Sequence, residues 1–184
     1  YTLWSWGQNN VGQLGDGTTI GKSSPTQVAG NVTSYSQITS GTNDTILIRT
    51  TDSIMIGTGL NTAGQLGDTS VISKSSPVLV SGPASTSWSS VSGGNSSAYA
   101  IATTGRLYAW GLGTSGQLGD LTIISKSSPV LVSGPAATSW KAVFGGPYSG
   151  NGNGATASAI PTSIPYLLYI WGNNSYGQVG NNNV

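Results

Sequence analysis

The sequence predicts an all-β protein, a β-propeller built from four-stranded blades, and two repeated motifs lead to this fold class. The first is the pentapeptide Gly-Gln-Leu-Gly-Asp, which begins at Gly12, Gly64 and Gly116, so that both steps are 52 residues. A weaker copy begins at Gly177, 61 residues after the third. The second motif is the tag Lys-Ser-Ser-Pro, which starts at Lys22 and recurs twice at the same 52-residue spacing. Repeats of this length are typical of solenoids, propellers and arrays.

The best-defined repeat reads as four short strands separated by turn signals. Its first strand alternates small and large residues, and the turn that follows carries Gly105, where a positive φ is expected. A glycine-rich loop and the Lys-Ser-Ser-Pro tag then separate the second strand from the third. The predicted strands are residues 98–102, 107–110, 130–132 and 140–144. Four short strands per repeat match one propeller blade.

The whole chain is expected to form one propeller-repeat array. The third repeat carries nine extra residues between Pro147 and Pro165, and this glycine- and asparagine-rich stretch reads as a long irregular loop rather than as strand. About three and a half blades do not reach the roughly four that a closed propeller needs. We therefore expect a partial propeller, completed by further chain or by further copies. The repeats are approximately 1–53, 54–106, 107–167 and a partial unit at 168–184.

The composition favours a neutral polar surface. Only 11 of the 184 residues are charged, and Ser, Thr and Asn supply 29, 21 and 13 residues. A net charge of +1 gives no electrostatic footprint for nucleic acid. No apolar run approaches the length of a membrane-spanning helix, so membrane insertion is not expected. Such a surface suits a secreted protein or part of an assembly.

Catalytic chemistry has few candidate residues. There is no His, no Cys and no Glu, so the usual general base and the soft metal ligands are absent from the sequence. Three of the five aspartates share one repeat position and should lie about one blade apart, which does not make a pair of cooperating carboxylates. The sequence therefore predicts a non-enzymatic protein with no cofactor and no metal. The aspartates are Asp16, Asp44, Asp52, Asp68 and Asp120.

The repeated charges and tryptophans favour structural roles. A loop aspartate followed six residues later by a lysine can close a turn through side-chain hydrogen bonds and a local ion pair. The alternative is a ring of lysines on one face that meets an acidic partner. Three tryptophans share one repeat position and are expected to pack between blades, and Trp88 and Trp140 share a second core position. The residues of these structural sets are Asp16, Asp68, Asp120, Lys22, Lys74, Lys126, Trp6, Trp110 and Trp171.

A Trp-Gly pair followed by Gly-Gln-Leu-Gly-Asp, after a Gly-Gly, a strand, a turn and a second strand, resembles the regulator of chromosome condensation repeat. The resemblance covers almost the whole chain and implies a propeller, seven-bladed in the best known members. Many family repeats carry a His just after the Gly-Gly, whereas Asn43, Asn95 and Tyr148 lie near that place here. The nucleotide-exchange function of the founding member therefore has no support at residue level. The Ser/Thr/Asn-rich style is similar to bacterial secreted members and to bacteriophage structural proteins.

The expected function is a non-enzymatic structural or attachment protein, most of all a bacteriophage virion component of the tail, fibre or capsid surface. Its location would be the virion or the extracellular space. Its partners would be other structural proteins, further copies of itself, or host-surface glycans or proteins. Alternatives are a secreted propeller binding protein, such as an enzyme inhibitor or adhesin (the resembling family includes a β-lactamase inhibitor), and an exchange-factor-like regulator.

Loops rather than strands are expected to make the contacts, because strand residues are committed to packing between blades. Tyr and Asn combine contact area with adaptable hydrogen bonding. The alternative is that these side chains are merely solvated. The candidate contact residues are Tyr148, Asn151, Asn153 and Tyr166 in the insertion, and Asn9, Asn10, Asn61 and Tyr176 in the other loops.

Overall fold

The structure is a computed structural model that describes residues 2–30, 34–41, 45–83, 87–134, 139–146, 156–163, 167–175 and 178–180, with the backbone alone at 45–49. Within these ranges the chain forms strands, turns and loops, and it has no helix that could cross a membrane. The strands are β1 (Trp4–Gly7), β2 (Lys22–Gln27), β3 (Tyr35–Ser40), β4 (Thr45–Thr50), β5 (Met55–Gly59), β6 (Lys74–Leu79), β7 (Trp88–Gly93), β8 (Ser97–Ala102), β9 (Leu107–Gly111), β10 (Lys126–Leu131), β11 (Trp140–Gly145), β12 (Thr156–Pro161) and β13 (Tyr169–Gly172).

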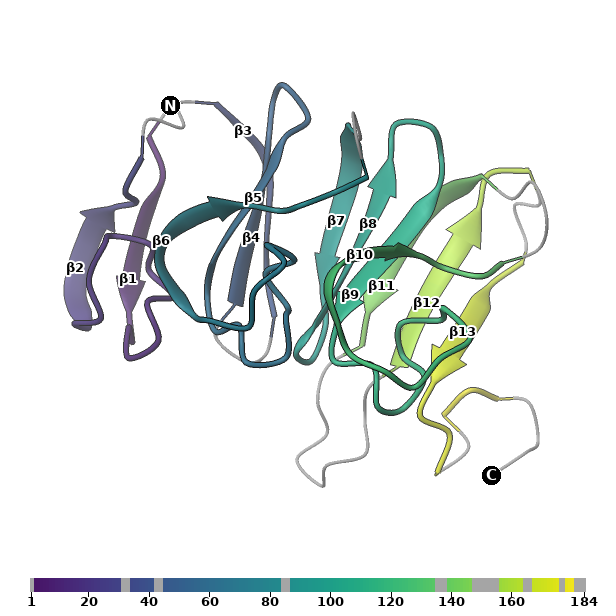
Figure 1. Ribbon diagram of the computed structural model, residues 1–184. Helices are drawn as coiled ribbons and strands as arrows, with labels where there is room; N and C mark the ends of the chain where they lie inside the picture. Colours follow the sequence, from purple (N-terminus) through teal and green to yellow (C-terminus); the bar gives the residue numbers. More distant parts are fainter. Residues whose placement is uncertain are drawn as a thin grey trace.

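The strands form antiparallel sheets that lie side by side in chain order (Figure 1). Two sheets have four strands, β3 to β6 and β7 to β10, and each is a meander in which neighbours in sequence are neighbours in space. The described part of the chain adds a two-stranded sheet, β1 and β2, before them and a three-stranded sheet, β11 to β13, after them. The first strand β7 contacts both β3 and β11, so the sheets meet along their first strands. The predicted all-β class with four-stranded blades is confirmed.

The boundaries of the sequence repeats do not coincide with the boundaries of the sheets. Residues 54–106, one sequence repeat, contain β5 and β6 of one sheet and β7 and β8 of the next. In both four-stranded sheets the long loop between the third and fourth strands holds the pentapeptide, and the tag opens the fourth strand; the loop between β1 and β2 is equivalent. Each repeat therefore ties two neighbouring sheets together.

The fourth strand differs from its prediction. A strand was expected at 130–132, after the tag, but β10 begins at Lys126, includes the tag and ends at Leu131. Pro129 is tolerated because β10 is the outer strand of its sheet, where a missing N–H can face away from the ladder. The tag is therefore strand and not loop, in β2 and β6 as well as in β10.

The predicted irregular loop between Pro147 and Pro165 is wrong in part, because Thr156–Pro161 forms β12, the middle strand of the last sheet. Within β12 the small residues Ala157 and Ala159 are buried, whereas the residues between them are partly exposed. This alternation of period two is a strand signal that the surrounding glycines and prolines obscured. The remainder of that stretch, 147–155 and 164–166, lies outside the described residues.

The core lies between the sheets, and strand β8 shows how the sequence builds it. Its alanines, Ala98 and Ala100 among them, face the preceding sheet in a cluster that includes Met55. Its larger residues, Tyr99 and Ile101, face the following sheet in a second cluster. Alternate residues of a strand point to opposite faces, so β8 presents small side chains to one neighbouring sheet and large side chains to the other.

Close contacts join the sheets along their first strands. The Gln37 side chain donates to the Val91 carbonyl at 2.8 Å and accepts from its N–H at 3.1 Å. A Cβ on Gly93 would lie 2.7 Å from the Ser40 carbonyl oxygen, and one on Gly145 would lie 2.6 Å from the Gly93 carbonyl oxygen. Glycine at these places lets neighbouring backbones approach more closely than any side chain would permit.

Candidate binding surface

The pentapeptide loops are held against the next sheet along the chain. Gly12 and Gly64 both have φ +82°, and a Cβ there would lie 2.4 Å from Ser75 Cα and 2.6 Å from Ser127 Cα. The same serines accept backbone hydrogen bonds from the loop; the Thr69 N–H, for example, donates to the Ser127 carbonyl at 2.8 Å. The first glycine of the pentapeptide is therefore a docking point between blades as well as a turn residue.

The Trp-Gly position completes this docking from the other side. The Trp110 indole N–H donates to the Gln65 carbonyl at 2.9 Å, and the Trp171 indole N–H donates to the Gln117 carbonyl at 2.9 Å. Thr58 takes the same place in the second repeat and donates its hydroxyl to the Gly12 carbonyl. At three junctions between sheets, an N–H or O–H group of one sheet thus donates a hydrogen bond to a loop carbonyl of the preceding sheet.

Trp6 departs from the expectation that it packs between blades. It is 63% exposed, whereas Trp110 at the same repeat position is completely buried. Among the described residues no pentapeptide loop lies in front of β1, so Trp6 lacks the contact that buries Trp110. The second tryptophan position behaves as expected, since Trp88 and Trp140 are buried and pack edge-on against Tyr108 and Tyr169.

Each loop contains an ion pair between its aspartate and the first residue of the following strand. The carboxylate–ammonium distances are 3.3 Å for Asp16 and Lys22, 3.5 Å for the second loop and 3.4 Å for the third. Asp16 also accepts hydrogen bonds from the Thr18 N–H at 2.9 Å and the Thr18 hydroxyl at 2.8 Å. The structure shows the turn-closing arrangement that the sequence suggests, and it leaves each loop electrically neutral.

The environment of these carboxylates favours their charged form. Burial alone would raise the pKa of Asp16, but hydrogen bonds from Thr18, Lys22 and Asn9 outweigh it and lower the pKa from 3.8 to about 2. The pKa values of Asp68 and Asp120 are lowered in the same way, against burial, by their loop hydroxyls and lysines. All three loops therefore keep their ion pairs well below neutral pH.

Asn9 and Asn61 were expected to offer their amides to a partner, and the structure corrects this. They are 1% and 0% exposed. The Asn61 side chain donates to Asp68 at 2.9 Å and to the Ser70 and Ile72 carbonyls, and it accepts from the Leu66 N–H at 2.9 Å. These bonds fill the inside of the loop and leave no amide group for a partner. The amides are buried because they supply hydrogen-bond partners to backbone groups of the loop that have no backbone partner within reach.

The other predicted contact residues divide into two groups. Asn10 is exposed, and its side-chain oxygen accepts hydrogen bonds from Gln8 at 3.0 Å and Gln13 at 3.2 Å. The rest of the predicted set lies outside the described residues: Tyr148, Asn151, Asn153, Tyr166 and Tyr176. No group of three or more Asp residues that could hold a metal lies together in the described ranges.

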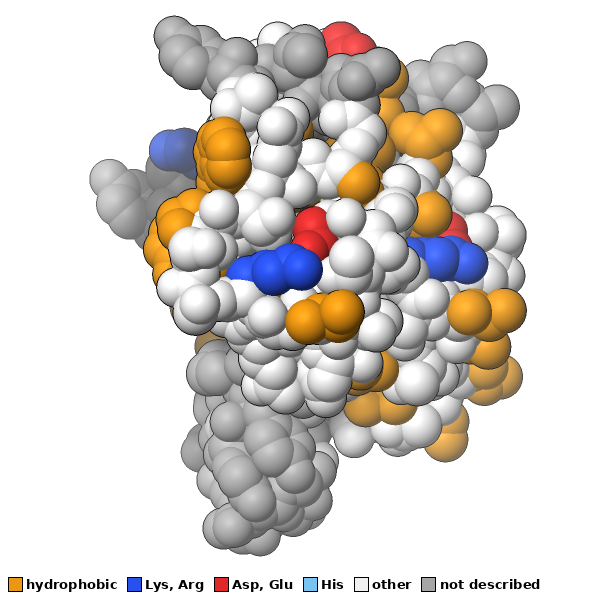
Figure 2. Space-filling model, turned by 90° about the vertical axis from the view of Figure 1, so that its left-hand side faces the viewer, with side chains coloured by type: hydrophobic (Ala, Val, Ile, Leu, Met, Phe, Trp, Pro, Cys, Tyr) orange, Lys and Arg blue, Asp and Glu red, His pale blue; other side chains and the backbone are white. Residues whose placement is uncertain are grey.

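The structure also reveals a row of exposed aliphatic side chains that the sequence analysis missed. Ile20, Ile72 and Ile124 occupy the same repeat position, two residues before the lysine, and are 67%, 67% and 62% exposed. We call these three residues the isoleucine row. Figure 2 shows basic atoms against acidic atoms at two places on one face, with hydrophobic side chains close to each. The signal in the sequence was the same 52-residue spacing.

Hydrogen bonds within each loop hold the backbone that carries the isoleucine row. The Thr18 hydroxyl, which donates to Asp16, also accepts from the Ile20 N–H at 3.4 Å, and Ser70 and Thr122 take its place in the other loops. The loops are thus fixed from within, while their isoleucines face solvent. Solvent-facing residues on loops that a scaffold holds in place are common binding elements.

This architecture is that of a β-propeller array, a class of repeat protein whose loops are fixed on stacked sheets. A family model described as the regulator of chromosome condensation (RCC1) repeat matches residues 2–48, 56–101 and 104–149, and a second model of that repeat matches 88–117. The chain therefore belongs to the RCC1 repeat family, and the resemblance noted in the sequence is confirmed. No curated protein sequence matches the chain.

Solved structures share the fold at low identity. Human WBSCR16 is 19% identical with a TM-score of 0.77, and the match covers 92% of this chain and 42% of that one. Prp20p from Saccharomyces cerevisiae, described with its binding to Gsp1p and histones, is 20% identical with a TM-score of 0.75 and covers 100% and 44%. Yeast RCC1 (Prp20) bound to Kap60 is 18% identical with a TM-score of 0.72 and covers 93% and 39%. The chain thus spans less than half the length of these structures.

Proposed function

We propose that this chain is a non-enzymatic protein-binding module that meets its partner through the isoleucine row. The observation that carries the proposal is three exposed isoleucines at one repeat position, each on a loop that is closed by an ion pair and is electrically neutral. An apolar row without free charge suits a partner surface that is itself apolar and uncharged. The protein-binding described for Prp20p and for yeast RCC1 supports the same class of function.

The finer proposal concerns location. The protein belongs on the outside of a particle or cell, with a bacteriophage virion component as the leading case. The support is the composition, with 11 charged residues in 184 and a surface of neutral hydroxyl and amide groups. Such a surface suits an assembly in which neighbouring proteins supply the contacts, and its scarcity of charge is unusual for a free protein in a crowded cytosol.

A binding experiment with matched variants tests both parts. Tagged protein would be incubated with intact particles from its source, and the bound fraction would be measured after sedimentation. The triple variant Ile20→Ser, Ile72→Ser, Ile124→Ser should lose association while keeping its circular dichroism spectrum. The control carries the same number of aliphatic-to-serine changes at the exposed residues Ile54, Leu79 and Leu131, and it should still bind. Equal binding by the two triple variants would contradict the role of the isoleucine row. Failure of the wild-type protein to sediment with the particles would contradict the proposed location.

A further inference from the structure

A groove of about 260 Å³ lies between the second and third pentapeptide loops. One wall comes from the second loop, and the other comes from the third loop and the start of β10. Both walls belong to sheets that have all four strands, so neither the first nor the last sheet shapes this groove. Its lining residues are Thr62, Ala63, Val71, Leu112, Ser125 and Ser127.

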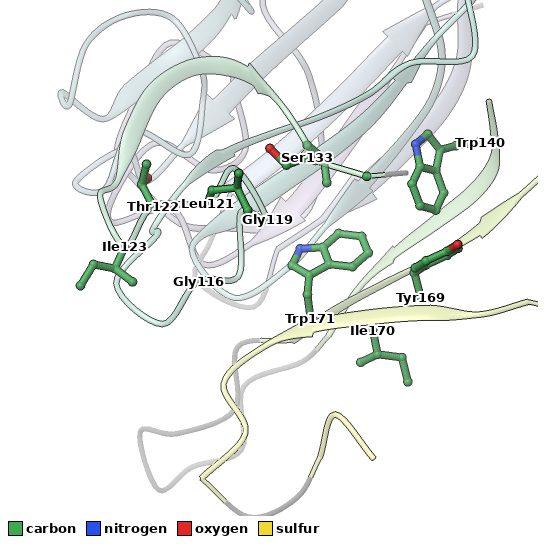
Figure 3. Close-up of a pocket in the computed structure, with 12 residues that line it drawn as sticks. Gly116, Gly119, Leu121, Thr122, Ile123, Ser133, Trp140, Tyr169, Ile170 and Trp171 are labelled. Carbon is green, nitrogen blue, oxygen red and sulfur yellow. The ribbon is translucent and has the colours of Figure 1, made fainter. Parts of the chain in front are cut away.

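A larger groove, of about 530 Å³, lies beside β13 and differs in kind. Trp171 and Tyr169 rise from β13 toward the loop that carries Gly119, and Ile170 points the other way (Figure 3). In the two four-stranded sheets, the outer strands β6 and β10 take the place beside the third strand. The larger groove therefore corresponds to the place of a fourth strand, whereas the smaller groove lies between loops whose sheets are already paired.

Hydrogen bonds hold both walls of the smaller groove. The Ala63 N–H donates to the side-chain oxygen of Gln65 at 2.8 Å, and Gln65 is itself 1% exposed. The Thr69 N–H donates to the Ser127 carbonyl at 2.8 Å, which joins the second loop to β10. A Cβ on Gly64 would lie 2.6 Å from Ser127 Cα, so the two walls touch beside the groove. Like most binding sites, the groove is formed before any partner arrives.

The charges around the groove are already paired. None of the residues that line it is charged. The nearby Lys74 bonds to Asp68 at 3.5 Å, and Lys126 bonds to Asp120 at 3.4 Å. A charged group that entered the groove would lose its hydration without gaining a free partner of opposite charge. The occupant is therefore uncharged.

The size and the walls of the groove suit one aliphatic side chain. Small-molecule sites usually have volumes of roughly 300 to 1,000 Å³, and this groove is smaller. Val71, which is 58% exposed, and Leu112 give it aliphatic walls, and the residues that line it include no aromatic ring or carboxylate to hold a sugar. Ile72 and Ile124 directly adjoin lining residues in the chain, so two members of the isoleucine row border the groove.

We propose that this groove receives one large aliphatic side chain, such as a leucine, from an uncharged segment of the protein that meets the isoleucine row. The inference rests on the proposed function and adds the point of insertion. The equivalent place between the first and second loops has Val11 and Thr19 where this groove has Ala63 and Val71, so it offers less room and is more polar. A side chain that fills a pocket within a rim of weaker contacts is a common source of binding energy and selectivity.

A disulfide-exchange experiment tests the groove without the partner. The chain has no cysteine, so Thr62→Cys places a single thiol in the groove, and Asn10→Cys places one at the equivalent exposed site of the first loop. Each variant is equilibrated in mercaptoethanol with the disulfides of isobutanethiol, cysteamine and thioglucose. Exchange forms one mixed disulfide on the protein and releases one ligand thiol, and mass spectrometry measures the adducts. The isobutyl adduct should be favoured about tenfold or more at Thr62→Cys, relative to its share at Asn10→Cys.

A second substitution shows whether the preference belongs to the groove. Adding Ala63→Val to Thr62→Cys gives this groove the larger side chain of the first one, Val11, and should abolish the preference for the isobutyl group. Equal adduct ratios for Thr62→Cys and Asn10→Cys would overturn the proposal. A preference for thioglucose at Thr62→Cys would overturn the choice of an aliphatic occupant.

The sedimentation assay with intact particles then connects the groove to the partner. The double variant Ala63→Val, Val71→Thr keeps the isoleucine row and should bind about tenfold or more weakly. Its control, Val11→Ala with Thr19→Val, changes the equivalent residues of the first groove and should bind no more weakly than the wild-type protein. Undiminished binding by the first double variant would overturn the proposal but leave the isoleucine row in place. Failure of the wild-type protein to sediment would contradict the proposed location, and the exchange experiment would still decide what the groove accepts.

Discussion

Trp110 in the middle of the array and Trp6 at its first sheet occupy the same repeat position, yet their exposed fractions are 0% and 63%. The difference is the loop that stands in front of them: Trp110 docks on the Gln65 carbonyl, and Trp6 has no equivalent loop among the described residues. The comparison teaches that the Trp-Gly position stabilises the junctions between sheets, whereas the repeated Asp–Lys pairs act within single loops. Nearest-neighbour contacts of this kind are the main source of stability in repeat proteins.

The largest effect is expected from the two tryptophans themselves. Trp110→Ala should lower the free energy of unfolding by about 3 to 5 kcal/mol, because it leaves a large cavity and removes the indole hydrogen bond to Gln65. Trp6→Ala should change it by less than about 1 kcal/mol, as is usual for an exposed residue. Urea unfolding followed by circular dichroism measures both. Similar losses for the two variants would refute the comparison.

The glycines that start the pentapeptide give the next largest difference. Gly64→Ala should destabilise by about 3 kcal/mol or more, because it combines strain at positive φ with a clash against the Ser127 backbone. Gly116→Ala carries only the strain and should cost about 1 kcal/mol. Thermal unfolding of the two proteins checks the order. A cost for Gly116→Ala that equals that of Gly64→Ala would show that strain alone matters.

A third contrast lies inside the loops. Asn61 fills its loop with hydrogen bonds, whereas the third loop carries Gly113 at this position, and a Cβ there would lie 2.5 Å from the Ile124 carbonyl oxygen. Asn61→Ala should cost about 2 kcal/mol, because it leaves the Leu66 N–H and the Asp68 carboxylate short of a partner. Gly113→Asn should also destabilise, since the third loop has closed over that space. Denaturant midpoints of both variants test the idea, and a stabilising Gly113→Asn would contradict it.

The smallest effect concerns pH. The folded pKa of Asp16 is about 2, below its ordinary 3.8, so its stabilising contribution is complete above about pH 4 and is lost as the pH falls toward 2. Asp16→Asn should lower stability at neutral pH and reduce its decline over that range. The measurement is the free energy of unfolding at several pH values in both proteins. Parallel curves would show that another carboxylate dominates the acid transition.

The repetition allowed the fold to be predicted from the sequence. Parts of the site could not be predicted, because they depend on contacts between neighbouring segments. The 52-residue motifs predicted both ends of β8, β9 and β11 to within one residue, because strand patterns and turns coincide there. β12 was missed because its alanine alternation is embedded among glycines and prolines. The burial of Asn61 and the exposure of Trp6 depend on which side of a loop faces a neighbour, and a sequence does not encode that locally. The isoleucine row could have been found, since its spacing is visible in the sequence.

The offset between sequence repeats and sheets has a consequence for how such a molecule can change in size. Because residues 54–106 supply two strands to each of two sheets, copying a 52-residue stretch from the part of the array that keeps this period adds two strands to each of two sheets, which is the content of one whole sheet. Deleting such a stretch removes one sheet and joins the remaining neighbours through equivalent surfaces. Gene duplication can therefore lengthen or shorten the array in single steps without passing through an intermediate that has an unmatched interface.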